Sequence, residues 1–261
     1  MISDVDAKYQ LHNKKLESLN TTMALVVLTG SEKKLLSKEA NIKAVVENIE
    51  CQLLAQSLTW NISMIGANTV WSGGATGLGV KVAVVDTGIN LTHADLSANI
   101  KGGYNAINPK KSANDDNGHG THVAGIIAAL NNNIGVVGVA PQASLYAVKV
   151  LNASGTGTLA GLIKGIQWAI DHDMDVINMS LGFGTATEAQ LSPLGDVIHS
   201  AVLANITVVA AAGNDQTHFT ELPGRYPDVF AVAAVDSNRN LAYFNSTGKI
   251  DFSAPGVAVY S

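Results

Sequence analysis

The sequence predicts an α/β protein with three layers, a mostly parallel sheet with helices on both faces, preceded by a small α+β segment. Near-continuous apolar runs alternate with segments of helical periodicity, and this order builds parallel sheets. Hydrophobic residues make up 47% of the 261 residues, which is enough for a large core and excludes a disordered chain. The composition also changes along the chain near residue 54, which predicts a boundary there.

The change near residue 54 divides the chain into residues 1–54 and 55–261. The first part is rich in lysine and contains one glycine, whereas the second part holds the other 24 of the 25 glycines. Within the first part, the apolar residues 23–28 predict a strand. Residues 31–36 predict a short helix with Ser31 as its N-cap. Residues 42–49 alternate in part between apolar and polar and predict a second strand.

The second part contains apolar runs typical of strands that are buried on both faces. These predicted strands cover residues 80–85, 145–150, 176–179, 207–212 and 229–235. Residues 159–170 place Leu159, Leu162, Ile163, Ile166 and Ile170 on one helical face, and residues 123–130 predict another helix. In sheets of this kind, functional groups gather at the carboxyl ends of the strands.

Composition excludes several classes of function. The net charge is −5 without a basic cluster, which argues against a nucleic-acid partner. Cys51 is the only cysteine, so neither an intrachain disulfide nor a cysteine-based zinc site is expected. No apolar run is long enough to span a membrane, so we expect no membrane partner. The polar residues 1–20 lack the apolar stretch of a signal peptide.

Asp86 and His119 are the residues with the clearest chemical potential. Asp86 ends a predicted buried strand, where it is either a turn cap or a partner for another polar group. His119 lies between two glycines at the start of a predicted helix. A carboxylate that accepts from one imidazole nitrogen leaves the other nitrogen free as a general base. For His122, three residues later, we expect a structural role, because a His-x-x-His metal pair lacks a third ligand here.

Five segments around these residues together resemble the subtilisin family of serine proteases. They are VAVVDTGIN (82–90), NGHGTHVAGIIAAL (117–130), VVGVAPQASLYAVKVL (136–151), WAIDHDMDVINMSLG (168–182) and VVAAAGND (208–215). The resemblance covers the chain from about Gln56 to Ser261 and is most similar to secreted bacillary subtilisins. It implies a serine endopeptidase that hydrolyses polypeptide substrates through an acyl-enzyme.

The resemblance also assigns catalytic roles. Asp86 corresponds to the orienting aspartate and His119 to the general base. Asn214, which by itself would pass for a turn residue, corresponds to the side-chain donor of the oxyanion hole. Such a donor is worth roughly 3–4 kcal/mol, a magnitude established in this same family.

The resemblance further implies that substrate lies as an extended strand between two edges of the protein. One edge is Ser180, Leu181 and Gly182, and the other is Gly155, Thr156 and Gly157. Residues 222–227 (LPGRYP) resemble the base of the primary specificity pocket, which puts Glu221 near its floor. A carboxylate there would favour Lys or Arg at the cleaved position. The alternative, which the sequence favours, is a solvent-exposed loop glutamate.

A structural calcium site is implied by a further set of matches. Asparagines 131–133 begin a loop that by itself would be ordinary turn chemistry. In the family this loop binds Ca²⁺, and its carboxylate, amide and carbonyl oxygens suit that ion. The matching residues are Gln56, Asp95, Asn132 and the carbonyls of Leu130, Ile134 and Val136.

Residues 1–54 resemble the later part of the family's pro-segment, an intramolecular partner that would make the chain a zymogen. An unrelated N-terminal extension is the alternative. The match further implies a secreted, monomeric enzyme, although no signal peptide precedes the pro-segment. An intracellular family member would explain that lack, but residues 55–57 (AQS) resemble a secreted mature start.

The largest departure from the family concerns the nucleophile. The G-T-S-M-A-type motif that carries the family's serine does not occur in this sequence, and Ser253 and Ser261 lie in the wrong context to replace it. We therefore expect a form truncated before its nucleophile that is inactive and prone to associate. The rival hypothesis is a non-catalytic pseudoprotease that acts as a binding or inhibitory module.

Overall fold

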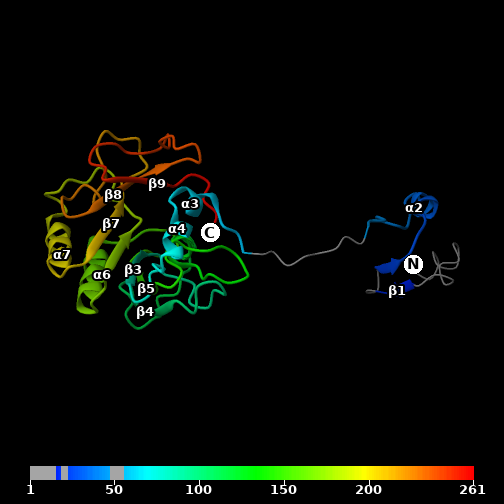
Figure 1. Cartoon of the computed structure of the whole chain (residues 1–261), viewed down its shortest axis with the longest axis horizontal. Coiled ribbons are helices and arrows are strands. Elements are labelled where there is room, and N and C mark those ends of the chain that lie inside the picture. Colours follow the sequence, from blue (N-terminus) through cyan, green and yellow to red (C-terminus); the bar gives the residue numbers. More distant parts are fainter. Residues whose placement is uncertain (1–15, 19–22, 48–55) are drawn as a thin grey trace. The chain divides into compact units, whose positions relative to one another are not determined.

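The computed structural model describes residues 16–18, 23–47 and 56–261. The chain divides into two compact units, Met1–Leu53 and Leu54–Ser261, and each is described separately here (Figure 1). Cys51 and Ala55 lie outside the described residues. Among the helices that are described, none is long and apolar enough to cross a bilayer.

The first unit contains two short strands and a helix. Strand β1 (Leu16–Ser18) pairs antiparallel with β2 (Ala24–Val26), which lies within the strand predicted at residues 23–28. Helix α2 (Gly30–Leu36) matches the predicted helix.

Three details of the first unit differ from prediction, and one of them is that β1 was not predicted. The N-cap of α2 is Thr29 rather than Ser31, because Thr29 is extended and forms a reciprocal capping box with Glu32, whose Oε2 accepts from Thr29 N at 2.6 Å. The strand predicted at 42–49 is absent over residues 42–47, and residues 48–49 lie outside the described part. Val46 is 81% exposed, so these side chains lack the buried face that fixes a strand.

The second unit is built on a seven-stranded parallel sheet, which confirms the predicted fold class. In spatial order the strands are β4 (Ile100–Asn105), β5 (Ser144–Lys149), β3 (Lys81–Asp86), β6 (Val176–Met179), β7 (Thr207–Ala211), β8 (Phe230–Val235) and β9 (Phe252–Pro255). The five predicted strands are the five inner ones. The edge strands β4 and β9 were not predicted, because one contains two glycines and exposed residues and the other ends in proline.

Helices cover both faces of this sheet. They are α3 (Trp60–Met64), α4 (Ala67–Ser72), α5 (His119–Ala128), α6 (Leu159–Asp171) and α7 (Ser192–Leu203). Helices α6 and α7 pack against each other on one side, as Figure 1 shows, while α5 packs on β3 and β5. Ala83 and Val85 of β3 belong to the core beneath α6 and α7, and Val82 and Val84 belong to the core that includes α5. This alternation between the two cores explains why residues 82–85 of β3 are all apolar.

Four helices depart from the sequence prediction, among them the short helices α3 and α4, which were not predicted. Helix α5 begins at His119 and ends at Ala128, instead of covering residues 123–130, because Ala129 is already extended with ψ 140°. Helix α7 was not predicted, since Pro193 and Gly195 interrupt its pattern. The proline stands in the first turn, where its missing N–H costs nothing, and Gly195 allows close approach of the Tyr226 ring.

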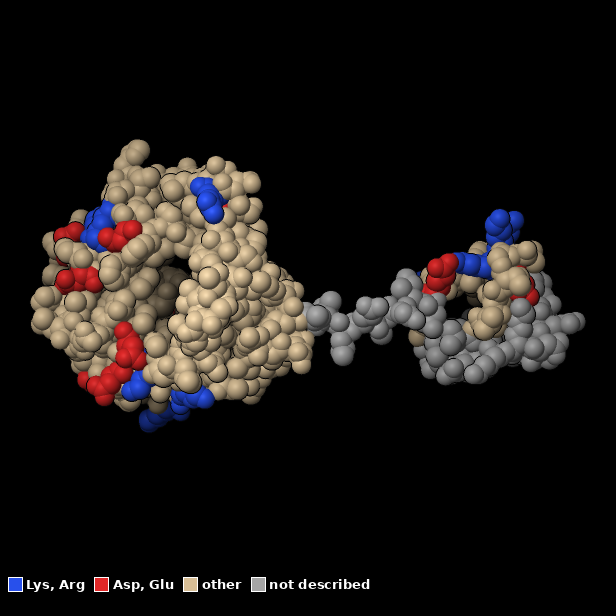
Figure 2. Space-filling view, viewed as in Figure 1, with Lys and Arg blue, Asp and Glu red and all other residues tan. Residues whose placement is uncertain are grey.

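The order of the strands reverses around β3, which lies between β5 and β6. Asp86 is the last residue of β3, and the parallel strands β5, β6 and β7 end at the same edge of the sheet. A crevice at such a point is the usual location of a site in open parallel sheets. On the face shown in Figure 2, charged side chains of the larger unit lie away from its hollowed centre.

Candidate active site

Asp86 and His119 form the centre of the candidate site. Nδ1 of His119 lies 2.8 Å from Oδ1 and 2.9 Å from Oδ2 of Asp86. The Asp86 carboxylate is fully buried and also accepts a hydrogen bond from Thr87 N at 2.6 Å, whereas half of the His119 side chain is exposed. The carboxylate selects the imidazole tautomer with its proton on Nδ1, so Nε2 remains free to accept a proton.

The same contact changes the basicity of the imidazole. The hydrogen bond to Asp86 raises the pKa of His119 above its ordinary value, burial opposes this, and the charges of Asp86 and Asp115 raise it further. The raised pKa means that the imidazolium, which forms when His119 takes a proton, is stabilised by these contacts. This is the property required of a general base.

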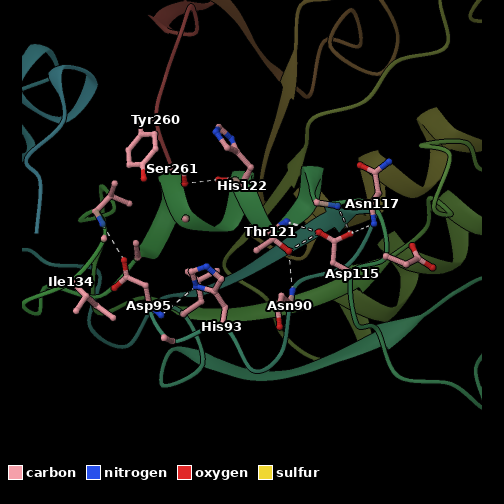
Figure 3. A pocket seen from close by; sticks show the side chains of 18 residues that line it. Asn90, His93, Asp95, Asp115, Asn117, Thr121, His122, Ile134, Tyr260 and Ser261 are labelled. Atoms are coloured by element: carbon pink, nitrogen blue, oxygen red, sulfur yellow. Dashed lines mark hydrogen bonds between the residues drawn. The ribbon is translucent and has the colours of Figure 1, made fainter. Parts of the chain in front are cut away.

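A second carboxylate, Asp115, fixes the loop that carries His119 (Figure 3). Its oxygens accept from the main-chain N–H groups of Asn117 at 2.9 Å, Gly118 at 3.0 Å and Thr121 at 3.0 Å. They also accept from the hydroxyls of Thr121 at 2.5 Å and Thr87 at 2.9 Å. Partial burial works against the charge, but these hydrogen bonds outweigh it and lower the pKa of Asp115 to about 2.

Thr87 joins the two carboxylate groups. Its hydroxyl donates to Asp115 and accepts from Gly120 N at 2.9 Å, so the turn after β3 is connected to the first turn of α5. Any side chain at Gly120 would collide with the carbonyl of Gly88, and so only glycine permits this approach. The sequence analysis missed Asp115, although an aspartate shortly before a Gly-His-Gly helix start is a signal for such a loop anchor.

Lys149 is a buried cation beneath the same turn, and it too was missed. Its Nζ donates to the carbonyl oxygens of Thr87 at 2.6 Å and Leu151 at 2.9 Å and to Oδ1 of Asp116 at 2.6 Å. All three N–H donors are therefore used, as burial of an ammonium requires. Because Lys149 lies within an apolar run, the sequence pattern predicted a buried strand and did not indicate this role for the lysine.

A pocket of about 450 Å³ beside His119 brings together most of the predicted substrate-binding residues. Gly155, Thr156 and Gly157 line it from the loop after β5, and Ser180, Leu181 and Gly182 line it from the segment after β6. A larger pocket of about 580 Å³ is lined by His122 and Ser261 rather than by His119 (Figure 3). Of these two pockets, His119 therefore lines only the smaller one.

Glu221 lies next to this pocket and is 7% exposed, so its interpretation as a solvent-exposed loop residue is wrong. Oε1 accepts from Asn214 N at 3.1 Å and Oε2 from Gly184 N at 3.2 Å. Any side chain at Gly182 would collide with this carboxylate, which places it directly behind the pocket wall. Asn214 is exposed and is connected to the wall through Glu221, but it does not itself line the pocket.

The predicted calcium ligands also converge. Gln56 Nε2 donates to the carbonyls of Leu130 at 2.6 Å and Val136 at 3.0 Å. Asp95 accepts from Asn132 Nδ2 at 2.7 Å and from Val136 N at 3.1 Å. Ile134 donates its main-chain N–H to Asn132 Oδ1 at 2.8 Å, so it belongs to the same loop.

This donor set fits calcium. In the described residues no group of three or more His, Cys, Asp or Glu side chains could hold a metal. A cation here would depend on one carboxylate, two side-chain amides and main-chain carbonyls, a set of oxygens suited to Ca²⁺. The amide N–H groups of Gln56 and Asn132 now satisfy these acceptors, and rotating each amide by half a turn would present its oxygen instead.

Comparisons with known proteins agree with this geometry. The model of the family described as "Subtilase family" matches residues 77–261. "Thermostable alkaline protease" of Halalkalibacterium halodurans is 48% identical over 90% of this chain and 63% of that protein. "Subtilisin E" of Bacillus subtilis is 44% identical over 100% of this chain and 67% of that protein.

A third relative, "Subtilisin Savinase" of Lederbergia lenta, is 49% identical over 79% of this chain and 75% of that protein. The chain spans 63% of the length of the H. halodurans protease and 60% of "M-protease" of Shouchella clausii. From the match of the family model and from these identities, the chain belongs to the subtilase family of serine proteases.

Proposed function

We propose that this chain supplies the base, the orienting carboxylate and the substrate cleft of a serine endopeptidase. The observation that carries the proposal is the buried Asp86 bonded to Nδ1 of His119, beside a pocket lined by two polypeptide segments. A peptide lying between those segments would add a strand to their free main-chain groups. The substrate class is therefore an extended polypeptide.

Each group has a chemical task in peptide-bond hydrolysis. Nε2 of His119 removes the proton of an attacking serine hydroxyl and returns it to the leaving amine. Asp86 holds the ring orientation and stabilises the imidazolium, without taking the proton itself. Asn214 is exposed, and its amide would donate to the negative oxygen of the tetrahedral intermediate.

We further propose that the nucleophile is not among these 261 residues. Within the described ranges, no serine hydroxyl is hydrogen-bonded to His119, and Ser261 instead donates to the carbonyl of His122 at 2.9 Å. A base acts only on a nucleophile within reach. We therefore propose that residues 1–261 by themselves do not turn over peptides. The same observation favours the second hypothesis, a pseudoprotease that binds polypeptides without cleaving them.

The test uses residues 1–261 with a fluorogenic peptide and a serine-directed covalent probe, and His119→Ala as the matched variant. We expect neither turnover nor labelling, and peptide binding that His119→Ala leaves largely intact. Turnover that disappears in His119→Ala would show that another serine is the nucleophile. Sequencing the coding DNA beyond the codon for Ser261 then separates the hypotheses. A continuing frame with G-T-S-M-A supports a protease, and a stop codon supports the pseudoprotease.

The proposed specificity is for a basic residue at the cleaved position. Glu221 is a buried carboxylate behind the pocket wall, and in the part of the chain that is described no lysine or arginine forms an ion pair with it. A buried charge without a counter-ion is costly, and a substrate ammonium or guanidinium would offset that cost.

The proposed cofactor is one structural Ca²⁺, which would be held by Gln56, by Asp95 and by the loop that contains Asn132. Bound there, it would supply a positive charge that joins the main chain before α3 to the loop after α5. We further propose that residues 1–54 act as a pro-segment in cis and that the protein works outside the cell, both from the resemblance to bacillary subtilisins.

A further inference from the structure

Besides Lys149, a second lysine of the same unit binds three oxygen atoms from separate parts of the chain. Nζ of Lys249 lies 2.6 Å from Oδ2 of Asp251, donates to the carbonyl of Gly224 at 3.4 Å, and donates to the carbonyl of Val229. Its side chain is only 29% exposed. Because an ammonium has three N–H donors, these three acceptors use all of them.

The acceptors connect a turn to the edge of the sheet. Gly224 and Val229 lie at the two ends of the turn before β8, and Asp251 directly precedes β9. Oδ2 of Asp251 also accepts from Ala231 N at 2.8 Å, and Asp251 N donates to the Ala231 carbonyl at 3.0 Å. The main chain of Lys249 contributes as well, since its carbonyl accepts from the Thr220 hydroxyl at 2.5 Å.

The three oxygens form a set that attracts a cation. Two carbonyls and one carboxylate present their negative ends to the same point, and without a positive charge between them they would repel each other. Oxygen-only sets of this kind are the ligands of hard cations such as Na⁺ and Ca²⁺, with water completing the coordination. The hydrogen bond from Lys249, followed by that from Ala231, lowers the pKa of Asp251, so the carboxylate stays charged.

We propose that Lys249 is a built-in cation whose ammonium holds the turn at residues 224–229 against the strand that begins after Asp251. Its removal leaves an oxygen-lined site for a free hard cation. The wild-type chain therefore needs no metal at this position. The inference is independent of the proposed protease activity, because its test measures stability and cation binding.

The experiment compares the melting temperatures of residues 1–261 and of Lys249→Ala at constant ionic strength. In tetramethylammonium chloride, whose cation is too large for the site, Lys249→Ala should melt about 5 °C lower. Replacing that salt by NaCl, or titrating CaCl₂ to concentrations on the order of 1 mM, should recover most of this loss in Lys249→Ala. Comparing the two salts shows which cation the site prefers.

Two controls make the result specific. Lys164→Ala removes one exposed lysine of α6 and should respond to cations as the unsubstituted chain does. Lys249→Ala combined with Asp251→Asn keeps an acceptor for Ala231 but removes the carboxylate charge, and should lose the extra response. This combination also separates the site from the proposed calcium loop at Asp95, which all the variants retain.

Lys249→Gln provides a second test, because Lys249→Ala could fail to fold. If Lys249→Ala is unfolded in tetramethylammonium chloride but regains its circular dichroism in NaCl or CaCl₂, the proposal holds. The proposal is overturned if neither variant gains more from cations than the unsubstituted chain. It is also overturned if the Lys249→Ala, Asp251→Asn combination keeps the response, or if both single variants melt as the unsubstituted chain does.

Discussion

Asp86 and Asp115 both lie close to His119, and their surroundings give them different tasks. Asp86 is fully buried and bonds directly to the imidazole, so it determines which ring nitrogen is free. Asp115 bonds to the main chain on either side of His119 and to two threonine hydroxyls. One carboxylate therefore acts on the ring, and the other acts on the backbone that positions the ring.

At the scale of single residues, Asp86→Asn should lower the pKa of His119. Because the folded pKa of His119 is raised above 6.5, the contact stabilises the protein fully below about pH 6.5 and this contribution is lost as the pH rises through the folded pKa. Histidine titration by NMR measures the shift, and melting at about pH 5 and pH 9 measures the loss, which should be larger at pH 5. Asp228→Asn, at an exposed pair with His199, should leave the His119 titration unchanged.

Asp115→Asn should destabilise the protein by about 5 °C at neutral pH, since it weakens charge-assisted hydrogen bonds. The pKa of Asp115 is lowered from 3.8 to about 2, so its contribution is present above about pH 4 and disappears as the pH falls toward 2. Melting curves across this range should therefore converge for the variant and the unsubstituted chain. Asp171→Asn on α6 is the matched control, and an equal effect there would contradict the assignment.

Glu221→Gln should remove the preference for basic substrates. We expect peptides ending in Lys or Arg to bind residues 1–261 at least about tenfold more tightly than those ending in Leu, a difference of about 1.4 kcal/mol. Calorimetric titration measures both series. Glu188→Gln, which changes an exposed carboxylate paired with Arg225, should retain the preference. An unchanged ratio in Glu221→Gln rules out the specificity role.

At the scale of elements, α5 connects the two proposed sites. Its first residue is His119, and the chain just beyond its last residue, Ala128, enters the loop with Asn132. Leu130 N donates to the Asp95 carbonyl at 3.0 Å, which fixes this exit from the helix. A change in the loop after α5 can therefore affect the end of the same helix that carries His119, the proposed general base.

Calcium should stabilise this element. A ligand that binds only the folded state adds roughly 2.7 kcal/mol at a hundredfold excess over its Kd. We expect a higher melting temperature of residues 1–261 in calcium than in chelator, and no such difference in Asp95→Asn. Asp196→Asn, at an exposed position of α7, should keep the response. Equal melting of the folded, unsubstituted chain in both conditions would disprove the site.

At the scale of the whole second unit, the two edges of the sheet differ in character. Edge strand β4 carries Lys101, a charged residue of the kind that blocks pairing with another chain. Edge strand β9 begins with Phe252, which is 59% exposed and packs against the 45%-exposed Phe230 with ring centroids 5.6 Å apart. In the described part of the chain β9 pairs only with β8, so no strand is hydrogen-bonded to its outer edge.

We expect residues 1–261 to associate through β9 as the protein concentration rises. Light scattering coupled to size-exclusion chromatography measures the molar mass, and Phe252→Lys should shift the distribution toward the monomer. Tyr243→Lys introduces the same charge at an 85%-exposed loop residue and should have a smaller effect. Association that persists unchanged in Phe252→Lys would assign it to another surface.

Strand and helix prediction succeeded where the apolar pattern of a segment itself indicates which of its faces are buried. Strand β3 and helix α6 have patterns that follow directly from contact with the core on two faces or on one. Among the elements that prediction missed are β4, β9 and α7, whose sequences contain Gly, Pro or exposed residues. These elements form because they pack or pair with a neighbouring strand or helix. Their own local sequence does not indicate that neighbour.

The sequence by itself determined the parallel α/β class and the family, because these depend on local periodicity and on motifs that are contiguous in the chain. Through the resemblance to the family it also predicted the roles of Asp86 and His119. Only the tertiary structure decided that Glu221 is buried behind Gly182, that Asp115 anchors the His119 loop, and that Lys249 joins Gly224, Val229 and Asp251. The physical reason is that burial and hydrogen bonding of a charged residue depend on partners far away in sequence, and folding alone brings those partners together.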